Sequence, residues 1–122
     1  MKLGLTWGEL ARAAGGRLIR GDAAARVDAV TTDTRTLREG QAFLALAGRR
    51  VDAHELLGAE LARKASGWII SRRPKTGAAL PASVVTVPDT LKALQALASF
   101  HRKRFDIPVV GVVGSNGKTT TK

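Results

Sequence analysis

The expected fold is decided by residues 83–98, which read SVVTVPDTLKALQALA. Ser83 to Val87 is a short β-branched run, which is typical of a buried strand. Pro88 and Asp89 then begin a helix that we expect to reach about Arg104. The apolar stripe of this helix would consist of Leu91, Leu94, Leu97, Ala98 and His101. A buried strand that passes directly into an amphipathic helix is typical of an α/β domain.

The same alternation of strands and helices extends to both sides of this stretch. Thr6 and Glu9 match a capping box, so a helix should begin there and end at Gly15-Gly16, with Leu5, Trp7, Leu10, Ala11 and Ala14 on its apolar face. A second helix over about 54–65 would be capped by Asp52. Short strands are predicted at 17–20, 27–32, 41–46, 68–70 and 108–113, and a loop at 72–82. The near-continuous apolar strands favour an α/β sheet covered on both faces.

The composition argues against several classes of protein. The chain has 122 residues, no cysteine and 44% hydrophobic residues, which excludes disulfide scaffolds and cysteine-ligated metal sites and argues against disorder. Its apolar runs are too short to cross a membrane, and its start does not resemble a signal peptide. We therefore expect a cytoplasmic protein without a membrane span. The net charge of +10 favours an anionic partner, although solvated arginines alone could account for it.

The segment after the last predicted strand has the pattern of a phosphate-binding loop, Gly114-Ser115-Asn116-Gly117-Lys118-Thr119-Thr120. Glycines let backbone amides turn toward phosphate oxygens, and a following helix adds its positive end. Lys118 would reach the phosphates, and the Thr119 hydroxyl could ligate Mg²⁺. The generic motif has another glycine where this chain has Val112, so an ordinary glycine turn is the alternative interpretation.

This loop lies at the end of the chain, which suggests a division into two parts. We expect a complete first domain over residues 1–106, and the strand and phosphate-binding loop of a second domain over 107–122. Such a chain would be the amino-terminal piece of a longer protein.

A second block joins Thr32-Asp33-Thr34-Arg35 to a Phe-Leu-Ala-Leu strand at 43–46, then to Gly48 and to Asp52-Ala53-His54. Taken alone, this block predicts a polar turn, a strand and a helix start. Asp33 and Arg35 could pair locally, and Thr34 could serve the turn.

The two blocks together resemble the Mur ligases of peptidoglycan synthesis. The resemblance covers nearly the whole chain and is most specific over 31–54 and 107–122. Pro88-Asp89-Thr90 and the shortened glycine loop are more similar to the ligase that adds D-alanyl-D-alanine. The alternative is the ligase that adds the third amino acid, diaminopimelate or lysine.

The resemblance implies a small mixed-sheet domain that binds UDP-N-acetylmuramoyl-peptide, followed by the start of an ATP-binding domain. ATP would convert the peptide carboxylate into an acyl phosphate that the amine of D-alanyl-D-alanine attacks, with Mg²⁺ and the catalytic Lys118 offsetting charge. Thr34 and Arg35 would lie by the uridine diphosphate. The uracil would be lined by Gly48, Arg49, Arg50 and Val51, and ATP would be held by Gly114, Ser115, Asn116, Gly117, Lys118, Thr119 and Thr120, with Thr119 on the metal.

The resemblance also sets expectations for the isolated chain. It should be a monomer that binds the UDP-muramoyl peptide weakly, binds ATP hardly at all and shows no ligase turnover. Ala53 stands where the family usually has glycine, and His54 is expected to be a helix-start or core residue rather than a base. Arg49 and Arg50 could instead face solvent.

A nucleic-acid-binding module is the alternative from another class. Leu5 to Gly16 could be the first helix of a helix-turn-helix, and the basic runs 72–75 and 102–104 could meet phosphates. Against it, a strand rather than a second helix is predicted at 17–20, and stacking aromatics are scarce. No nucleic-acid partner is therefore expected.

Overall fold

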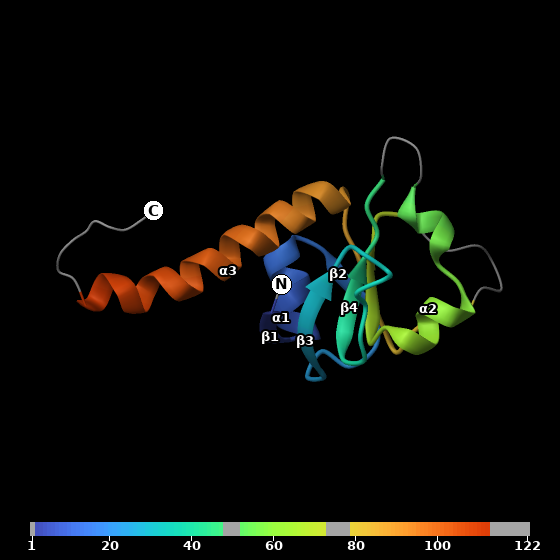
Figure 1. The fold of residues 1–122 in the computed structure, drawn as a ribbon, viewed down its shortest axis with the longest axis horizontal. Helices are drawn as coiled ribbons and strands as arrows, with labels where there is room; N and C mark the ends of the chain where they lie inside the picture. The colour runs from blue at the N-terminus through green and yellow to red at the C-terminus, as the bar shows by residue number, and fades with distance from the viewer. Residues whose placement is uncertain (1, 48–51, 73–78, 113–122) are drawn as a thin grey trace.

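A computed structural model describes residues 2–47, 52–72 and 79–112, and these residues form one mixed sheet between two layers of helices (Figure 1). The strands are β1 (Lys2–Thr6), β2 (Arg17–Arg20), β3 (Arg26–Thr31), β4 (Gln41–Leu44), β5 (Gly67–Ile70) and β6 (Ser83–Thr86). The helices are α1 (Trp7–Ala14), the short 3-10 helix η1 (Ala53–Leu56), α2 (Ala59–Lys64) and α3 (Thr90–Val112). The predicted α/β class and mixed sheet are confirmed.

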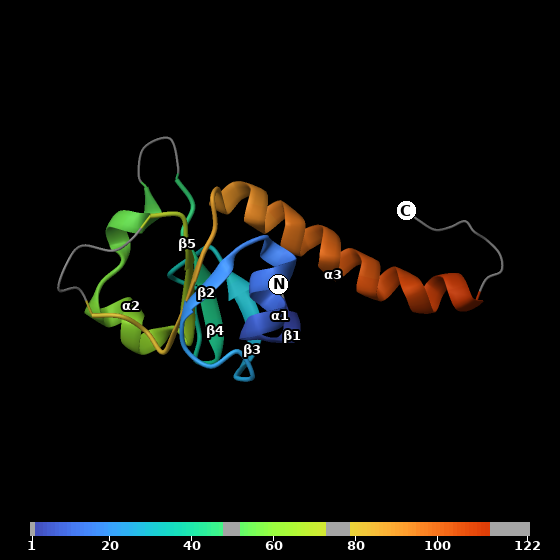
Figure 2. The same ribbon diagram turned by 180° about the vertical axis from the view of Figure 1, so that it is seen from behind.

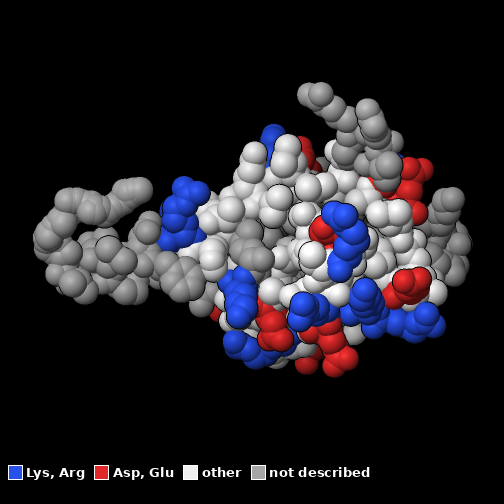
Figure 3. All heavy atoms as spheres, in the orientation of Figure 1, with Lys and Arg blue, Asp and Glu red and all other residues white. Residues whose placement is uncertain are grey.

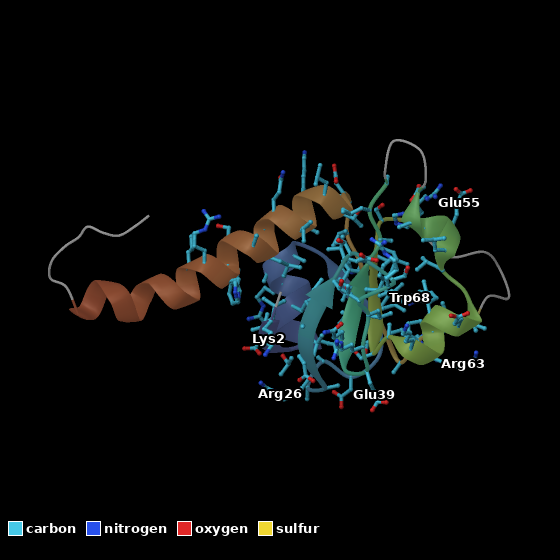
Figure 4. All side chains as sticks on the ribbon, in the orientation of Figure 1. Lys2, Arg26, Glu39, Glu55, Arg63 and Trp68 are labelled. Carbon is cyan, nitrogen blue, oxygen red and sulfur yellow. The ribbon has the colours of Figure 1, made fainter. Side chains whose placement is uncertain are left out.

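The strand order β1-β3-β4-β5-β6-β2 places four parallel strands at the centre and one antiparallel strand at each edge. Thr31 pairs with Phe43, Phe43 with Trp68, and Trp68 with Val84, so β3 to β6 run in step. Their carboxyl-terminal ends therefore meet along one side of the sheet, which we call the carboxyl edge. Arg26 and Glu39 lie at the opposite edge (Figure 4).

Helices cover both faces of the sheet, as the apolar strands predict. Helices α1 and α3 pack on one face, and η1 and α2 lie on the other (Figures 1 and 2). Side chains alternate between them: Ala42 and Leu44 join the α1 side, whereas Phe43 and Ala45 join the α2 side. Trp68 is fully buried on the α2 side (Figure 4). No helix in the described ranges combines the length and hydropathy that a membrane span requires.

The amino-terminal helix forms where the capping box predicts. The Thr6 hydroxyl accepts a hydrogen bond from the Glu9 amide at 3.2 Å, and the Glu9 carboxylate accepts one from the Thr6 amide at 2.9 Å. Gly15 ends the helix in the left-handed conformation with φ 75°. The predicted apolar face, Leu5, Trp7, Leu10, Ala11 and Ala14, is buried.

Strand β1 was not predicted, and the single helix over 54–65 is wrong. Only Leu3 and Leu5 carry the alternation of β1, and Gly4 between them adopts φ 59°, so the periodic signal is short. Asp52 caps a helix as expected, but that helix is η1, and the chain restarts as α2 after Gly58. Glycine disfavours a helix interior, which explains the break.

Helix α3 is longer than predicted, and its predicted apolar stripe faces the core only in part. It runs to Val112, so the predicted strand over 108–113 is wrong for residues 108–112. None of the six strands pairs with this segment, and a helix satisfies its backbone hydrogen bonds locally where a lone strand cannot. Leu97 of the predicted stripe is buried and Leu94 packs against the core, as expected. Thr90 and Ala93 are buried as well, whereas Leu91 is 54% exposed. Helix α3 runs across the domain boundary predicted between residues 106 and 107, and the division into two domains stays a prediction.

Candidate functional site

Four polar segments follow the parallel strands at the carboxyl edge. They are residues 32–36 after β3, 45–47 and 52–54 after β4, 71–72 after β5 and 87–90 after β6. In open sheets with parallel strands, ligands bind beyond the carboxyl ends of the strands. This edge is therefore the candidate functional site, and it collects residues from distant parts of the sequence.

The turn after β3 holds a carboxylate and a guanidinium in a fixed pair. Arg35 donates from Nε and Nη2 to the two carboxylate oxygens of Asp33 at 3.1 and 3.0 Å, and its backbone amide donates to Asp33 Oδ1 at 2.9 Å. The Thr36 amide closes the turn on the Asp33 carbonyl at 3.2 Å. This is the local pairing that the sequence predicts.

The pairing alters the acid–base properties of both side chains. Hydrogen bonds from the Arg35 side chain and then its amide lower the pKa of Asp33, and the Asp33 carboxylate raises the pKa of Arg35. The Arg35 side chain is 87% exposed, and only two of its five N–H donors are used by Asp33. The remaining donors are available to an anion at the edge.

A second group of polar side chains forms where β4 and β5 end. Ala47, which follows β4, and Asp52, which precedes η1, form an isolated antiparallel bridge. Asp52 Oδ1 accepts from the His54 amide at 2.9 Å and contacts His54 Nδ1 at 2.7 Å, and Asp52 Oδ2 pairs with Arg72 Nη2 at 2.5 Å. The Ser71 amide donates to His54 Nε2 at 2.9 Å.

These contacts keep the Asp52 carboxylate ionised. The hydrogen bond from the His54 amide, then the bond from the His54 ring, lower the pKa of Asp52, and the Arg72 charge adds to the effect. The side chain of His54 is only 4% exposed. His54 is thus a buried structural histidine, as expected, although it is also part of a polar network at the edge.

The start of α3 lies at the same edge, but its first backbone amides are already capped by a side chain. Asp89 Oδ1 accepts from the amides of Leu91 and Lys92 at 2.9 and 3.2 Å. A carboxylate therefore occupies the amides that could otherwise hold a phosphate. The cationic side chains described at this edge that could meet an anion are those of Arg35 and Arg72.

The structure brings some of the predicted site residues to this edge and does not describe others. Thr34 and Arg35 lie at the edge, and their contact with the uridine diphosphate stays a prediction. Gly48, Arg49, Arg50 and Val51 lie outside the described residues, as does the whole loop from Gly114 to Thr120, including Lys118 and the metal ligand assigned to Thr119. Within ranges 2–47, 52–72 and 79–112, no three His, Asp or Glu side chains gather as a metal site.

The sequence analysis missed the contact between Arg72 and Asp52 at this edge. It placed this residue in a loop and considered it only for nucleic-acid binding. The available signal was its position, because Arg72 comes two residues after the last residue of the buried strand β5. On the face shown in Figure 3, basic side chains are interspersed with acidic ones, so net charge alone does not mark the site.

This chain is similar in sequence to curated ligases and similar in fold to solved structures. The UDP-N-acetylmuramoyl-tripeptide–D-alanyl-D-alanine ligase of Synechocystis sp. is 42% identical over 97 residues, which are 80% of this chain and 21% of the relative. The ligase of the same name from Escherichia coli is 41% identical over 96 residues, 79% of this chain and 20% of the relative. The diaminopimelate ligase of Gloeobacter violaceus is 38% identical over 98 residues, which are 75% of this chain and 19% of the relative.

The structural likeness agrees with these matches. The crystal structure of MurF from Acinetobacter baumannii superposes with a TM-score of 0.70 and 28% identity, over 84% of this chain and 22% of that protein. No protein-family model matches the chain. The chain spans about one fifth of the length of these relatives. In sequence and in fold, the chain belongs to the Mur ligase family and corresponds to the amino-terminal domain of these enzymes.

Proposed function

We propose that this chain is the nucleotide-substrate-binding domain of an ATP-dependent Mur ligase of peptidoglycan synthesis. The ligase would join D-alanyl-D-alanine to UDP-N-acetylmuramoyl-tripeptide. The observation that carries the proposal is the identity of about two residues in five with two ligases of that name, across four fifths of the chain. The likeness to MurF from Acinetobacter baumannii supports the same assignment.

The geometry of the carboxyl edge supports a role in binding the nucleotide part of the substrate. Arg35 projects into solvent, and Asp33 uses only two of its five N–H donors, so the others can meet a phosphate. A guanidinium matches two phosphate oxygens at once, which suits a diphosphate. Residues 48–51, which lie outside the described residues between Ala47 and Asp52, are proposed to line the uracil.

The ATP and Mg²⁺ of the proposed reaction rest on the sequence of residues 114–120. Among the described helices, Glu9 lies in the first turn of α1 and Asp89 caps α3, so neither helix start offers a free phosphate site. In the full-length ligase, Lys118→Ala should lower turnover by several orders of magnitude and leave binding of the UDP substrate intact. Unchanged turnover would remove the phosphate-binding-loop assignment.

The alternative within the family is the ligase that adds the third amino acid. Relatives of that kind include the diaminopimelate ligase of Gloeobacter violaceus at 38% and the lysine ligase of Staphylococcus aureus at 36% identity. The two ligases use UDP-muramoyl substrates that differ in peptide length. Comparing turnover of the full-length enzyme with UDP-N-acetylmuramoyl-dipeptide and with the tripeptide separates the two proposals.

The nucleic-acid alternative receives no support from the fold. Helix α1 is followed by strand β2 and not by the second helix that a helix-turn-helix requires.

The predictions of a monomer and of a cytoplasmic location remain part of the proposal.

Titration calorimetry on this chain tests the proposed function directly. UDP-N-acetylmuramoyl-tripeptide should give a weak saturable signal, whereas ATP and D-alanyl-D-alanine should give almost none. Circular dichroism of the same sample checks that the chain is folded. A folded sample that gives no heat with the UDP substrate would contradict the assignment.

A further inference from the structure

The contacts of His54 fix both the position and the tautomer of its ring. A backbone amide can only donate, so the Ser71 amide, 2.9 Å from Nε2, requires an unprotonated Nε2. Nδ1 therefore carries the proton and donates it to Asp52 Oδ1 at 2.7 Å. The ring is nearly inaccessible and joins the end of β5 to the start of η1.

This arrangement commits both oxygens of the Asp52 carboxylate. Oδ1 accepts two hydrogen bonds from His54, which leaves Oδ2 directed at the guanidinium of Arg72. The Arg72 side chain is 56% exposed, and its pair with Asp52 uses one of its five N–H donors. A solvent-exposed arginine is thus anchored through a carboxylate to a buried ring.

Arg72 lies at the same edge as Arg35, on the neighbouring part of the sheet. Residue 72 follows the end of β5, and residue 35 follows the end of β3, with only β4 between the two strands. Adjacent strands are about 4.8 Å apart, so the two strand ends are separated by about 10 Å. Two guanidinium groups, each oriented by its own aspartate, therefore serve one edge.

We propose that Arg72 contacts an anionic group of the nucleotide substrate, a phosphate or a carboxylate, and that Asp52 and His54 are its positioning residues. The inference rests on the proposed function, because it assumes that a UDP-linked substrate binds at this edge. Pre-orientation lowers the entropy lost when a long side chain orders on its ligand. The buried ring supplies that order at a site where solvent-exposed ion pairs alone contribute little.

The same residues do not form a hydrolytic triad, although their order suggests one. Ser71 Oγ lies 3.3 Å from His54 Nε2, and Asp52 binds the other ring nitrogen. However, the single lone pair of Nε2 already accepts the Ser71 amide at the shorter distance of 2.9 Å. The ring is therefore not free to take a proton from the hydroxyl, so its role is positional.

Calorimetry with two probes, UDP and UDP-N-acetylmuramoyl-tripeptide, tests the contact. Arg72→Ala should weaken tripeptide-substrate binding about 10- to 100-fold, as expected for a lost charged hydrogen bond. Arg72→Lys keeps the charge without the planar guanidinium, so its affinity should lie between those of the wild type and of Arg72→Ala. The control is Arg63→Ala, which removes the same charge from α2 and should bind as wild type (Figure 4). Equal losses for both probes indicate a phosphate contact, and loss for the tripeptide substrate alone indicates a carboxylate contact.

A double-mutant cycle tests whether His54 acts through Arg72. His54→Ala should weaken binding, and His54→Asn should restore part of it because its amide can still donate to Asp52. In the Arg72→Ala background, His54→Ala should change binding less than about 2-fold. Effects that multiply instead would show that His54 is merely structural and would overturn its positioning role.

The outcomes separate this inference from the proposed function. If the wild-type chain is folded and binds neither probe, the proposed function fails. If it binds and Arg72→Ala binds equally well, or if Arg63→Ala loses as much, the contact assigned to Arg72 is overturned. Thermal unfolding of each variant confirms that the compared samples are folded.

Discussion

The carboxyl edge contains two aspartate–arginine pairs that are built in different ways. Asp33 and Arg35 are two residues apart, form a bidentate pair within one turn, and have side chains 38% and 87% exposed. Asp52 and Arg72 are separated by 20 residues, meet only because β4 and β5 are adjacent, and are 26% and 56% exposed. Only the second pair is anchored to a buried side chain, His54.

The difference indicates a division between local and tertiary control of the edge. The first pair should persist in any conformation that keeps the turn, because its contacts are local. The second pair exists only while the sheet is intact and His54 is in place. Perturbing β5 or His54 should therefore affect Arg72 strongly and Arg35 weakly.

The largest effect is expected from Gly67→Ala, at the start of β5. A Cβ at this position would overlap the buried Trp7 ring and lie 2.6 Å from the Ser83 carbonyl oxygen, and neither group can move freely. Overpacking of this kind costs about 1–3 kcal/mol. Urea unfolding should show that the free energy of unfolding falls by an amount near the top of that range.

Gly58→Ala is the matched control for this substitution. A Cβ at Gly58 would meet nothing within 4 Å, and its backbone is extended. This variant should unfold like the wild type, within error. Equal losses in the two variants would mean that the contact with Trp7 does not limit position 67.

The next effect is that of His54→Ala on the second pair. The variant removes a nearly inaccessible ring and the hydrogen bonds to Ser71 and Asp52, so we expect a loss of about 2 kcal/mol in the free energy of unfolding. His54→Asn should recover part of it. If urea unfolding shows that His54→Ala lowers the free energy of unfolding by less than the experimental error, His54 does not anchor the second pair.

The sequence predicts the elements whose signals are local. The capping box at Thr6, the left-handed Gly15 and the pairing of Asp33 with Arg35 all depend on residues within a few positions. The central strands are predictable because a sheet covered on both faces requires continuous apolar runs, as in β5. Local patterns thus account for most of the fold.

What the sequence does not predict depends on tertiary position. No spacing rule connects Asp52 to Arg72, because their contact follows from the parallel pairing of β4 with β5. The apolar run after residue 107 satisfies a strand pattern, yet a strand needs a partner and the described sheet provides none there. Strand β1 is too short to give a clear period without its partner β3.

The two aspartates also predict how stability depends on pH. Hydrogen bonds lower the pKa of Asp33 and of Asp52 below the unfolded value of about 3.9. Each ionised carboxylate therefore stabilises the fold above that pH, and the contribution is lost as the pH falls through the folded pKa. Denaturant unfolding between pH 6 and pH 2 should show this loss. Asp52→Asn should flatten the acid slope more than Asp33→Asn, because solvent screens the more exposed pair of Asp33 with Arg35. Slopes identical to wild type would rule out both carboxylates as the cause.

The smallest effect on stability is expected for Arg35→Ala, and it gives the most direct test of the comparison. The Arg35 side chain is 87% exposed, so solvent and salt screen its pair with Asp33, and thermal unfolding should change by no more than the error. The same variant should still weaken binding of the UDP substrate, because the free donors of Arg35 are the ones proposed to meet phosphate. Stability and binding would then separate at Arg35 but change together at His54, whose ring supports both the fold and the second arginine. If Arg35→Ala destabilises the chain as much as His54→Ala, the two pairs are equally structural, and the division between a local and an anchored arginine is wrong.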